Sequence, residues 1–254
     1  MIQVKNISAG YMGKTIIKAV TLDFVPGEVL VLLGPNGSGK TTLLKTALGL
    51  MPHMDGEILY DGVDIRKLKH KQIAQKAAFL SQSRNIPSIQ SFRMVLHGRF
   101  PYISYPRYYS EEDKQIARNA MIETQTIPYE KQNVSELSGG QRQSVYLAMA
   151  LAQDTETIFM DEPTTYLDIS HQLQSMKTAK KLAQEGKAVV LVLHDLALAL
   201  SFADRVAVFE SGQLLCCDKP DSIYRSGVLN EVFQVGVHCV DTEHGKQYYC
   251  TMKD

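Results

Sequence analysis

The segment that most constrains the fold of this chain is Gly34-Pro35-Asn36-Gly37-Ser38-Gly39-Lys40-Thr41. It fits the pattern G-x-x-x-x-G-K-[ST] of a phosphate-binding loop. An apolar run, Val29–Leu33, precedes it and indicates a buried strand, and Thr42–Leu48 indicates a helix. Glycines let backbone N–H groups converge on phosphate oxygens, and the positive end of the following helix faces the same oxygens. The order strand, loop, helix therefore predicts a nucleotide phosphate site formed by residues 34–42 rather than an ordinary glycine turn.

Composition narrows the class of protein. Hydrophobic residues make up 44% of the 254 positions, enough for a substantial core in one large domain or two small ones. The 27 basic and 27 acidic residues give no net charge, whereas nucleic-acid binders usually carry a basic surplus. We therefore expect no nucleic-acid partner.

The N-terminus lacks the apolar core of a signal peptide, and the apolar stretch Ala188–Ala203 is too short to span a bilayer. We expect a cytoplasmic chain whose contact with a membrane comes through a partner.

Short apolar runs alternate with helical patterns, which indicates an α/β architecture. The expected core strands are Val29–Leu33, Ile158–Asp161, Ala188–Leu193 and Val206–Phe209. Helical patterns occupy Glu111–Thr124, Val145–Ala152 and Lys177–Glu185. Residues 85–156 show no strong strand, so we expect a single domain, 1–254, in which a helical subdomain (85–156) interrupts an α/β core (1–84 and 157–254).

The strand beginning at Thr157 ends in two acids, Asp161 and Glu162. An acid at the end of such a strand holds Mg²⁺, usually through water, together with the Thr41 hydroxyl. Glu162 is placed to polarise the water that attacks a γ-phosphate, and Lys40 reaches the terminal phosphates. Two adjacent acids alone would more often simply begin a loop. Here they follow the segment Leu137-Ser138-Gly139-Gly140-Gln141, which favours the catalytic interpretation.

Three further side chains are candidates for the same site. His194, after Ala188–Leu193, could bond the γ-phosphate. Gln82, after the apolar run Ala77–Leu80, could reach Mg²⁺ or the attacking water, and Tyr11 could stack on adenine. The alternative for each is an ordinary polar or exposed loop residue.

A second phosphate-binding element is formed by Ser138 with the backbone of Gly139 and Gly140, because Gln141 begins another helix whose positive end points the same way. The two elements lie on different expected subdomains. If Lys40 of one subunit and Ser138 of another clasp each ATP, two copies must associate face to face as a two-fold dimer.

The whole chain resembles the ATPase subunits of ATP-binding cassette (ABC) transporters, whose motifs occur here in the family's order. The stretch from Asp161 to Leu173, with Asp168-Ile169-Ser170-His171-Gln172, is most similar to ATPases of iron–siderophore, haem and vitamin B12 importers. Gly98-Arg99-Phe100-Pro101-Tyr102 resembles a segment of the same group.

The resemblance implies an ATPase that uses ATP and Mg²⁺ and includes Asp168, in the loop Tyr166-Leu167-Asp168, among its nucleotide-binding residues. It also implies a homodimer on permease subunits at the cytoplasmic face of a membrane, served indirectly by a substrate-binding protein. The transported compound could be an iron chelate, haem or a cobalamin.

Other interpretations stay open at this point. A cassette that moves nothing across a membrane, such as the ATPase of iron–sulfur cluster assembly, shares the phosphate loop and signature. DNA-repair and chromosome ATPases separate those motifs by long coiled coils, and the interval here shows no sustained heptads. A binding module without catalysis disagrees with the joint presence of Lys40, Asp161, Glu162 and His194.

The segment 99–109 holds five aromatic residues and two prolines and precedes the amphipathic helix. Aromatic residues and arginine are enriched at protein interfaces. We expect this segment to dock a short permease helix; the alternative is that its rings only cover the helical subdomain.

Overall fold

A computed structural model describes residues 1–82, 86–106, 108–165, 167–243 and 245–253. Its central sheet has six strands in the order β10-β9-β3-β8-β7-β6. Neighbouring strands are parallel from β9 to β6, and β10 is antiparallel to β9. The strands are β3 (Val29–Leu33), β6 (Ala77–Leu80), β7 (Thr157–Asp161), β8 (Ala188–Val192), β9 (Arg205–Glu210) and β10 (Gln213–Asp218). All four predicted core strands belong to this sheet.

Strand β3 shows why its residues are apolar on both faces. Val29, Val31 and Leu33 belong to one hydrophobic cluster, while Leu30 and Leu32 belong to another. Side chains alternate across a strand, so a central strand covered on both sides needs an uninterrupted apolar run.

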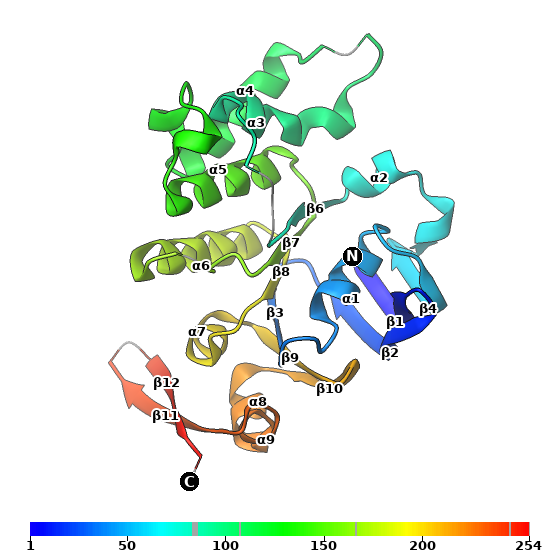
Figure 1. Ribbon diagram of the computed structural model, residues 1–254, viewed down its shortest axis with the longest axis vertical. Coiled ribbons are helices and arrows are strands. Elements are labelled where there is room, and N and C mark those ends of the chain that lie inside the picture. Colours follow the sequence, from blue (N-terminus) through cyan, green and yellow to red (C-terminus); the bar gives the residue numbers. More distant parts are fainter. Residues whose placement is uncertain (83–85, 107, 166, 244, 254) are drawn as a thin grey trace.

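A second sheet covers one side of the central sheet (Figure 1). It is antiparallel, with strand order β2-β1-β4-β5. Its strands are β1 (Ile2–Tyr11), β2 (Lys14–Phe24), β4 (His53–Tyr60) and β5 (Val63–Asp64). Helix α1 (Lys40–Ala47) buries Leu43 and Leu44 in the hydrophobic cluster shared by the two sheets. The sequence patterns do not predict this antiparallel sheet.

Between residues 86 and 156 the described residues form helices and no strand, apart from an isolated bridge between Gln90 and Asn133. The α-helices are α3 (Ser91–Leu96), α4 (Glu111–Glu123) and α5 (Gly139–Ala152). The short 3₁₀ turns are η2 (His97–Tyr102), η3 (Ile127–Tyr129) and η4 (Val134–Glu136). They gather at one end of the molecule, away from the antiparallel sheet (Figure 1). Residues 83–85, where we expect the first subdomain boundary, lie outside the described residues.

The remaining helices flank the sheets. They are η1 (Ile65–Lys67), α2 (His70–Ala74), α6 (Ile169–Gln184), α7 (Leu196–Phe202), α8 (Pro220–Ser226) and α9 (Val228–Phe233). Helix α6 begins eight positions before the predicted Lys177, because the Asp168 side chain caps it by accepting a hydrogen bond from the His171 N–H.

The C-terminal segment ends in a hairpin, β11 (Val235–Thr242) and β12 (Gly245–Met252). Its Val237 and Tyr248 are buried in the central hydrophobic cluster, as expected for a segment that packs onto the core. Within the described ranges, we find no helix whose length and apolarity would let it cross a membrane.

Candidate nucleotide-binding site

The phosphate loop leaves the carboxyl end of β3 and enters α1 through backbone conformations that require glycine. Gly34 and Gly39 have φ angles of +153° and +98°. A Cβ atom on Gly34 would lie 2.2 Å from the Phe209 carbonyl oxygen, and one on Gly39 would lie 2.4 Å from Cγ2 of Ile17. Neighbouring strands therefore press against the loop, and only glycine fits at these two positions.

Lys40 is the first residue of α1, and its side chain folds back over the loop. The Nζ ammonium donates hydrogen bonds to the carbonyl oxygens of Gly34 (2.6 Å) and Pro35 (3.0 Å) and to Oγ of Ser38 (3.3 Å). Burial lowers the pKa of Lys40, while the nearby carboxylates of Glu162 and Asp161 oppose that shift. A positive charge is thus held at the mouth of the loop.

Asp161 ends β7 and is 2% exposed. Burial raises the pKa of its carboxyl group, although the hydrogen bond from Oγ1 of Thr41 (3.2 Å) lowers it. Carboxylate and hydroxyl oxygens are hard ligands of the kind Mg²⁺ prefers. The donor set formed by Thr41 and Asp161 therefore fits the ion that the sequence predicts.

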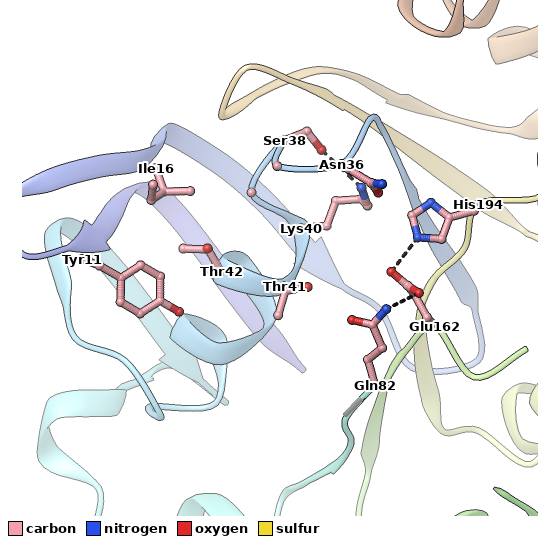
Figure 2. A pocket seen from close by; sticks show the side chains of 12 residues that line it. Tyr11, Ile16, Asn36, Ser38, Lys40, Thr41, Thr42, Gln82, Glu162 and His194 are labelled. Carbon is pink, nitrogen blue, oxygen red and sulfur yellow. Dashed lines mark hydrogen bonds and ion pairs between the residues drawn. The ribbon is translucent and has the colours of Figure 1, made fainter. Parts of the chain in front are cut away.

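Glu162 turns away from the direction of Asp161 because its backbone is left-handed, with φ +53°. Its Oε2 accepts hydrogen bonds from Nε2 of Gln82 (2.5 Å) and Oγ1 of Thr165 (3.0 Å). Its Oε1 lies 2.5 Å from Nε2 of His194 (Figure 2). Three side chains from three different segments thus orient one carboxylate.

These groups line one cavity of about 480 Å³, which opens between the antiparallel sheet, the phosphate loop and the carboxyl ends of the central strands (Figure 2). The sequence-predicted residues on its wall are Tyr11, Asn36, Gly37, Ser38, Gly39, Lys40, Thr41, Thr42, Gln82, Glu162 and His194. Gly34, Pro35 and Asp161 are not part of its lining but contact Lys40 or Thr41.

Two contributors were absent from the sequence prediction, Ile16 on the cavity wall and Thr165 beside Glu162. Met12 and Gly13, both at positive φ, turn β1 back into β2 and bring Ile16 near Tyr11. Recognising that turn would have identified Ile16.

The signature segment stands apart from this cavity. Ser138 caps α5, with its Oγ accepting from the Gln141 N–H (3.3 Å) and its own N–H donating to Oε1 of Gln141 (3.0 Å). Gly139 and Gly140 form the first turn of the helix. Neither they nor Ser138 and Gln141 line the cavity that contains Lys40.

Asp168 also lies outside the cavity lining and caps α6. Its Oδ1 accepts from the His171 backbone N–H (2.9 Å) and lies 2.8 Å from Nδ1 of His171. The hydrogen bond from the His171 backbone, followed by that from the ring, lowers the pKa of Asp168. Tyr166, which the sequence analysis placed in the same loop, lies outside the described residues.

The aromatic segment 99–109 divides into two kinds of residue. The Arg99 guanidinium is buried over the Tyr102 ring, 3.9 Å from its centroid, and donates to Asp113 (2.9 Å). The Tyr102 hydroxyl donates to the Gln153 carbonyl (2.9 Å). These two residues therefore pack within the helical region, and docking by this segment stays a prediction. Tyr105 is instead 95% exposed; Arg107 lies outside the described residues.

The sequence model of the ABC transporter family matches residues 17–165, and the chain belongs to this family. It therefore carries an ATP-binding cassette, in agreement with the predicted α/β fold with its phosphate loop.

Several named relatives align along nearly the whole chain. The petrobactin import ATP-binding protein FpuD of Bacillus anthracis is 35% identical, over 92% of this chain and 86% of that protein. The iron(3+)-hydroxamate import ATP-binding protein FhuC of Bacillus subtilis is 34% identical, over 98% and 94%. The hemin import ATP-binding protein HmuV of Rhodococcus jostii is 37% identical, over 90% and 78%.

Solved structures agree on the fold. A metal-chelate type ABC transporter in an inward-facing conformation superposes with a TM-score of 0.85 at 24% identity, covering 98% of this chain and 96% of that one. A bacterial ABC transporter cassette solved as a dimer, MJ0796, superposes with a TM-score of 0.76 at 29% identity, covering 87% and 99%.

Proposed function

We propose that this chain is the ATP-hydrolysing subunit of an importer whose cargo is an iron chelate (such as an iron–siderophore), haem or a cobalamin-type compound. The observation that carries the proposal is the Glu162 carboxylate, which Gln82, Thr165 and His194 orient at the edge of the cavity that Lys40 lines. The names of the relatives support the importer over the iron–sulfur cluster assembly alternative, because they describe siderophore and hemin import.

ATP is the substrate of this site. Tyr11, which is 48% exposed, and Ile16 offer the adenine ring an apolar wall at the open end of the cavity. The loop N–H groups and Lys40 bind the phosphates at the other end. Thr41 and Asp161, with Gln82 beside them, would hold Mg²⁺, whose chemistry is to neutralise charge on the terminal phosphates.

Glu162 is the general base for the attacking water. Its carboxylate accepts a proton as the water oxygen adds to the γ-phosphorus, and the bond to the leaving ADP oxygen breaks. The hydrogen bonds from Gln82 and Thr165 fix the carboxylate, so that it does not need to reorganise during the reaction. His194 contacts the other carboxylate oxygen and is placed to donate to the transferred phosphate.

Two copies and a permease complete the proposal. Ser138, Gly139, Gly140, Gln141 and Asp168 serve the nucleotide of a second copy, because they do not line the cavity of their own. Helix α2 and the segment Phe100–Ile103 together line a cavity of about 370 Å³. This cavity would receive a short helix of the permease. The cassette then acts as a peripheral subunit on the cytoplasmic face, and a substrate-binding protein on the other side delivers the cargo.

Glu162→Gln tests the assignment of the base. The amide keeps the shape of the side chain but cannot accept the proton, so steady-state ATPase activity should fall by about 10²–10⁴-fold. ATP should still bind, and an ATP-bound dimer should accumulate on size exclusion. Glu156→Gln, at an exposed acid one residue before β7, is the matched control and should behave as the parent. Near-normal turnover by Glu162→Gln would refute the assignment.

A further inference from the structure

His171 contacts both the helix that follows Asp168 and the helix that begins with the signature glycines. It lies in the first turn of α6, where Nδ1 is 2.8 Å from Oδ1 of Asp168. The other side of the ring faces Gly140 in the first turn of α5. A Cβ atom on Gly140 would lie 3.3 Å from Cδ2 and 3.4 Å from Nε2 of His171. The imidazole therefore packs against Gly140, the second glycine of the signature segment.

The orientation of the ring follows from its partner. The hydrogen bonds from His171 lower the pKa of Asp168, so this carboxylate is ionised at neutral pH and only accepts hydrogen bonds. The ring nitrogen next to it, Nδ1, must then carry the hydrogen. Nε2 is left on the side of Gly140. The same carboxylate that caps α6 thus also sets how the ring meets α5.

The contacts continue from Asp168 back to Glu162. Nε2 of Gln172 donates to the Leu167 carbonyl (3.1 Å) and, at 3.4 Å, to the Thr164 carbonyl. Thr165 donates to the Glu162 carboxylate (3.0 Å). The residues after the candidate base are therefore held by the first turn of α6, the same turn that carries His171.

Helix α5 holds this stretch from the opposite side. Nε2 of Gln143 donates to the Pro163 carbonyl (3.1 Å). Within α5, the Gly140 carbonyl accepts a bond from Oγ of Ser144 (3.1 Å). The start of α5 and the residues after Glu162 are therefore joined directly through Gln143, and His171 on α6 adds a contact at Gly140.

We propose that His171 is a positioning residue that holds the phosphate-binding turn Ser138–Gly140 in register with the candidate base Glu162. The inference rests on the proposed function, in which that turn binds the nucleotide of the second copy. His171 then ties the grip on the partner's nucleotide to the geometry of the base in its own subunit. His171 is not among the residues that line its own nucleotide cavity.

The test measures ATP-driven dimerisation in the Glu162→Gln background. His171→Ala removes both the ring and the bond to Asp168. Hydrogen bonds to charged groups are worth enough for about a tenfold change in an equilibrium constant, so the dimer should be about tenfold weaker by sedimentation. ATP binding to the monomer, followed with a fluorescent analogue at low protein concentration, should stay within about twofold of the parent. A merely structural defect would not separate these two readouts.

His171→Asn is the rescue variant, because its amide N–H can still donate to Asp168 while the ring is lost. It should recover part of the dimer affinity that His171→Ala loses. Lys177→Ala, at an exposed position of the same helix, is the matched control and should dimerise as the parent. If His171→Ala lacks a cooperative melting transition, His171→Asn becomes the test of the proposal. Its dimer should then be about threefold weaker than that of the parent.

The outcomes separate the two hypotheses. If the Glu162→Gln parent itself does not dimerise with ATP, the proposed function fails. If the parent dimerises and the folded His171 variants match Lys177→Ala, the proposed function stands and the role of His171 is overturned. Equal weakening of monomer binding and dimerisation would also overturn it, because the ring would then act on the phosphate loop.

Discussion

At the scale of single residues, the buried carboxylate of Asp161 lowers the stability of the folded chain. Its proposed role as a metal ligand explains why a buried acid stands at this position. Burial raises the pKa of its carboxyl group in the folded chain. A raised carboxyl pKa means that the folded state binds the proton more tightly than the unfolded state does. The contribution of this carboxyl group to the stability of the folded state is thus fully present below its pKa in the unfolded chain, about 4. That contribution is lost as the pH rises through its pKa in the folded chain.

Asp161→Asn should therefore stabilise the nucleotide-free protein at pH 7 by about 0.5–2 kcal/mol, because it removes a buried charge and keeps an oxygen for Thr41. The gain should shrink at pH 4, where the raised pKa leaves more of the parent carboxyl protonated. Thermal melts at the two pH values check this, and Mg²⁺-dependent ATPase activity should fall at least about 10²-fold. A variant that melts below the parent at pH 7 would contradict the account.

Sequence reasoning located the residues whose positions depend on local chain alone. Lys40 and Thr41 follow from the phosphate loop, and Asp161 follows from the end of an apolar strand. Thr165 could not be found in this way. Its bond to Glu162 depends on the left-handed backbone at that residue, and no residue preference predicts such a conformation for glutamate.

At the scale of elements, the aromatic segment 99–109 begins within η2 and ends before α4, and its exposed and packed rings lead to different predictions. Replacing Phe100 (54% exposed) and Tyr105 with serine should leave melting and basal ATPase activity near those of the parent. Co-purification with the permease should fall, because interface aromatics carry much of the binding energy.

Tyr102→Ser is the contrasting variant, since it loses a bond to the Gln153 carbonyl and the Arg99 contact. It should destabilise the chain by about 1–3 kcal/mol and lower its melting temperature. Full permease binding by the Phe100 and Tyr105 double variant would place the docking surface elsewhere.

Strands were predictable from sequence when they were buried on both faces. The run of five apolar residues in β3 is such a case. Strand β1 was not predicted because its pairing with β2 shifts register after Val4 and again after Ile7. Such bulges break the period-two alternation of side chains. The hairpin of β11 and β12 was not predicted because many of its side chains are exposed and its sequence lacks an apolar run.

At the scale of the whole molecule, one chain offers two candidate phosphate-binding elements that do not line the same cavity. Lys40 lines the nucleotide cavity, and Ser138 caps a helix outside its lining. A helix N-terminus with glycines attracts phosphate, so an element of this kind outside the lining of its own cavity suits the nucleotide of a second copy. The similar cassette MJ0796 was solved as a dimer, which shows that this fold can associate in pairs.

Mixing two inactive variants tests whether the site is shared. Lys40→Ala removes the phosphate-loop cation but leaves its own signature segment intact, whereas Ser138→Arg does the reverse. In a heterodimer one composite site combines both defects, and the other combines an intact Lys40 with an intact Ser138. Each variant alone should therefore be inactive, and ATPase activity should return on mixing, at most to one working site per dimer.

Mixing Lys40→Ala with Lys40→Ala that carries a different tag is the control and should stay inactive. If Ser138→Arg alone hydrolyses ATP at the parent rate, each copy completes its own site, and the face-to-face dimer is not the catalytic unit.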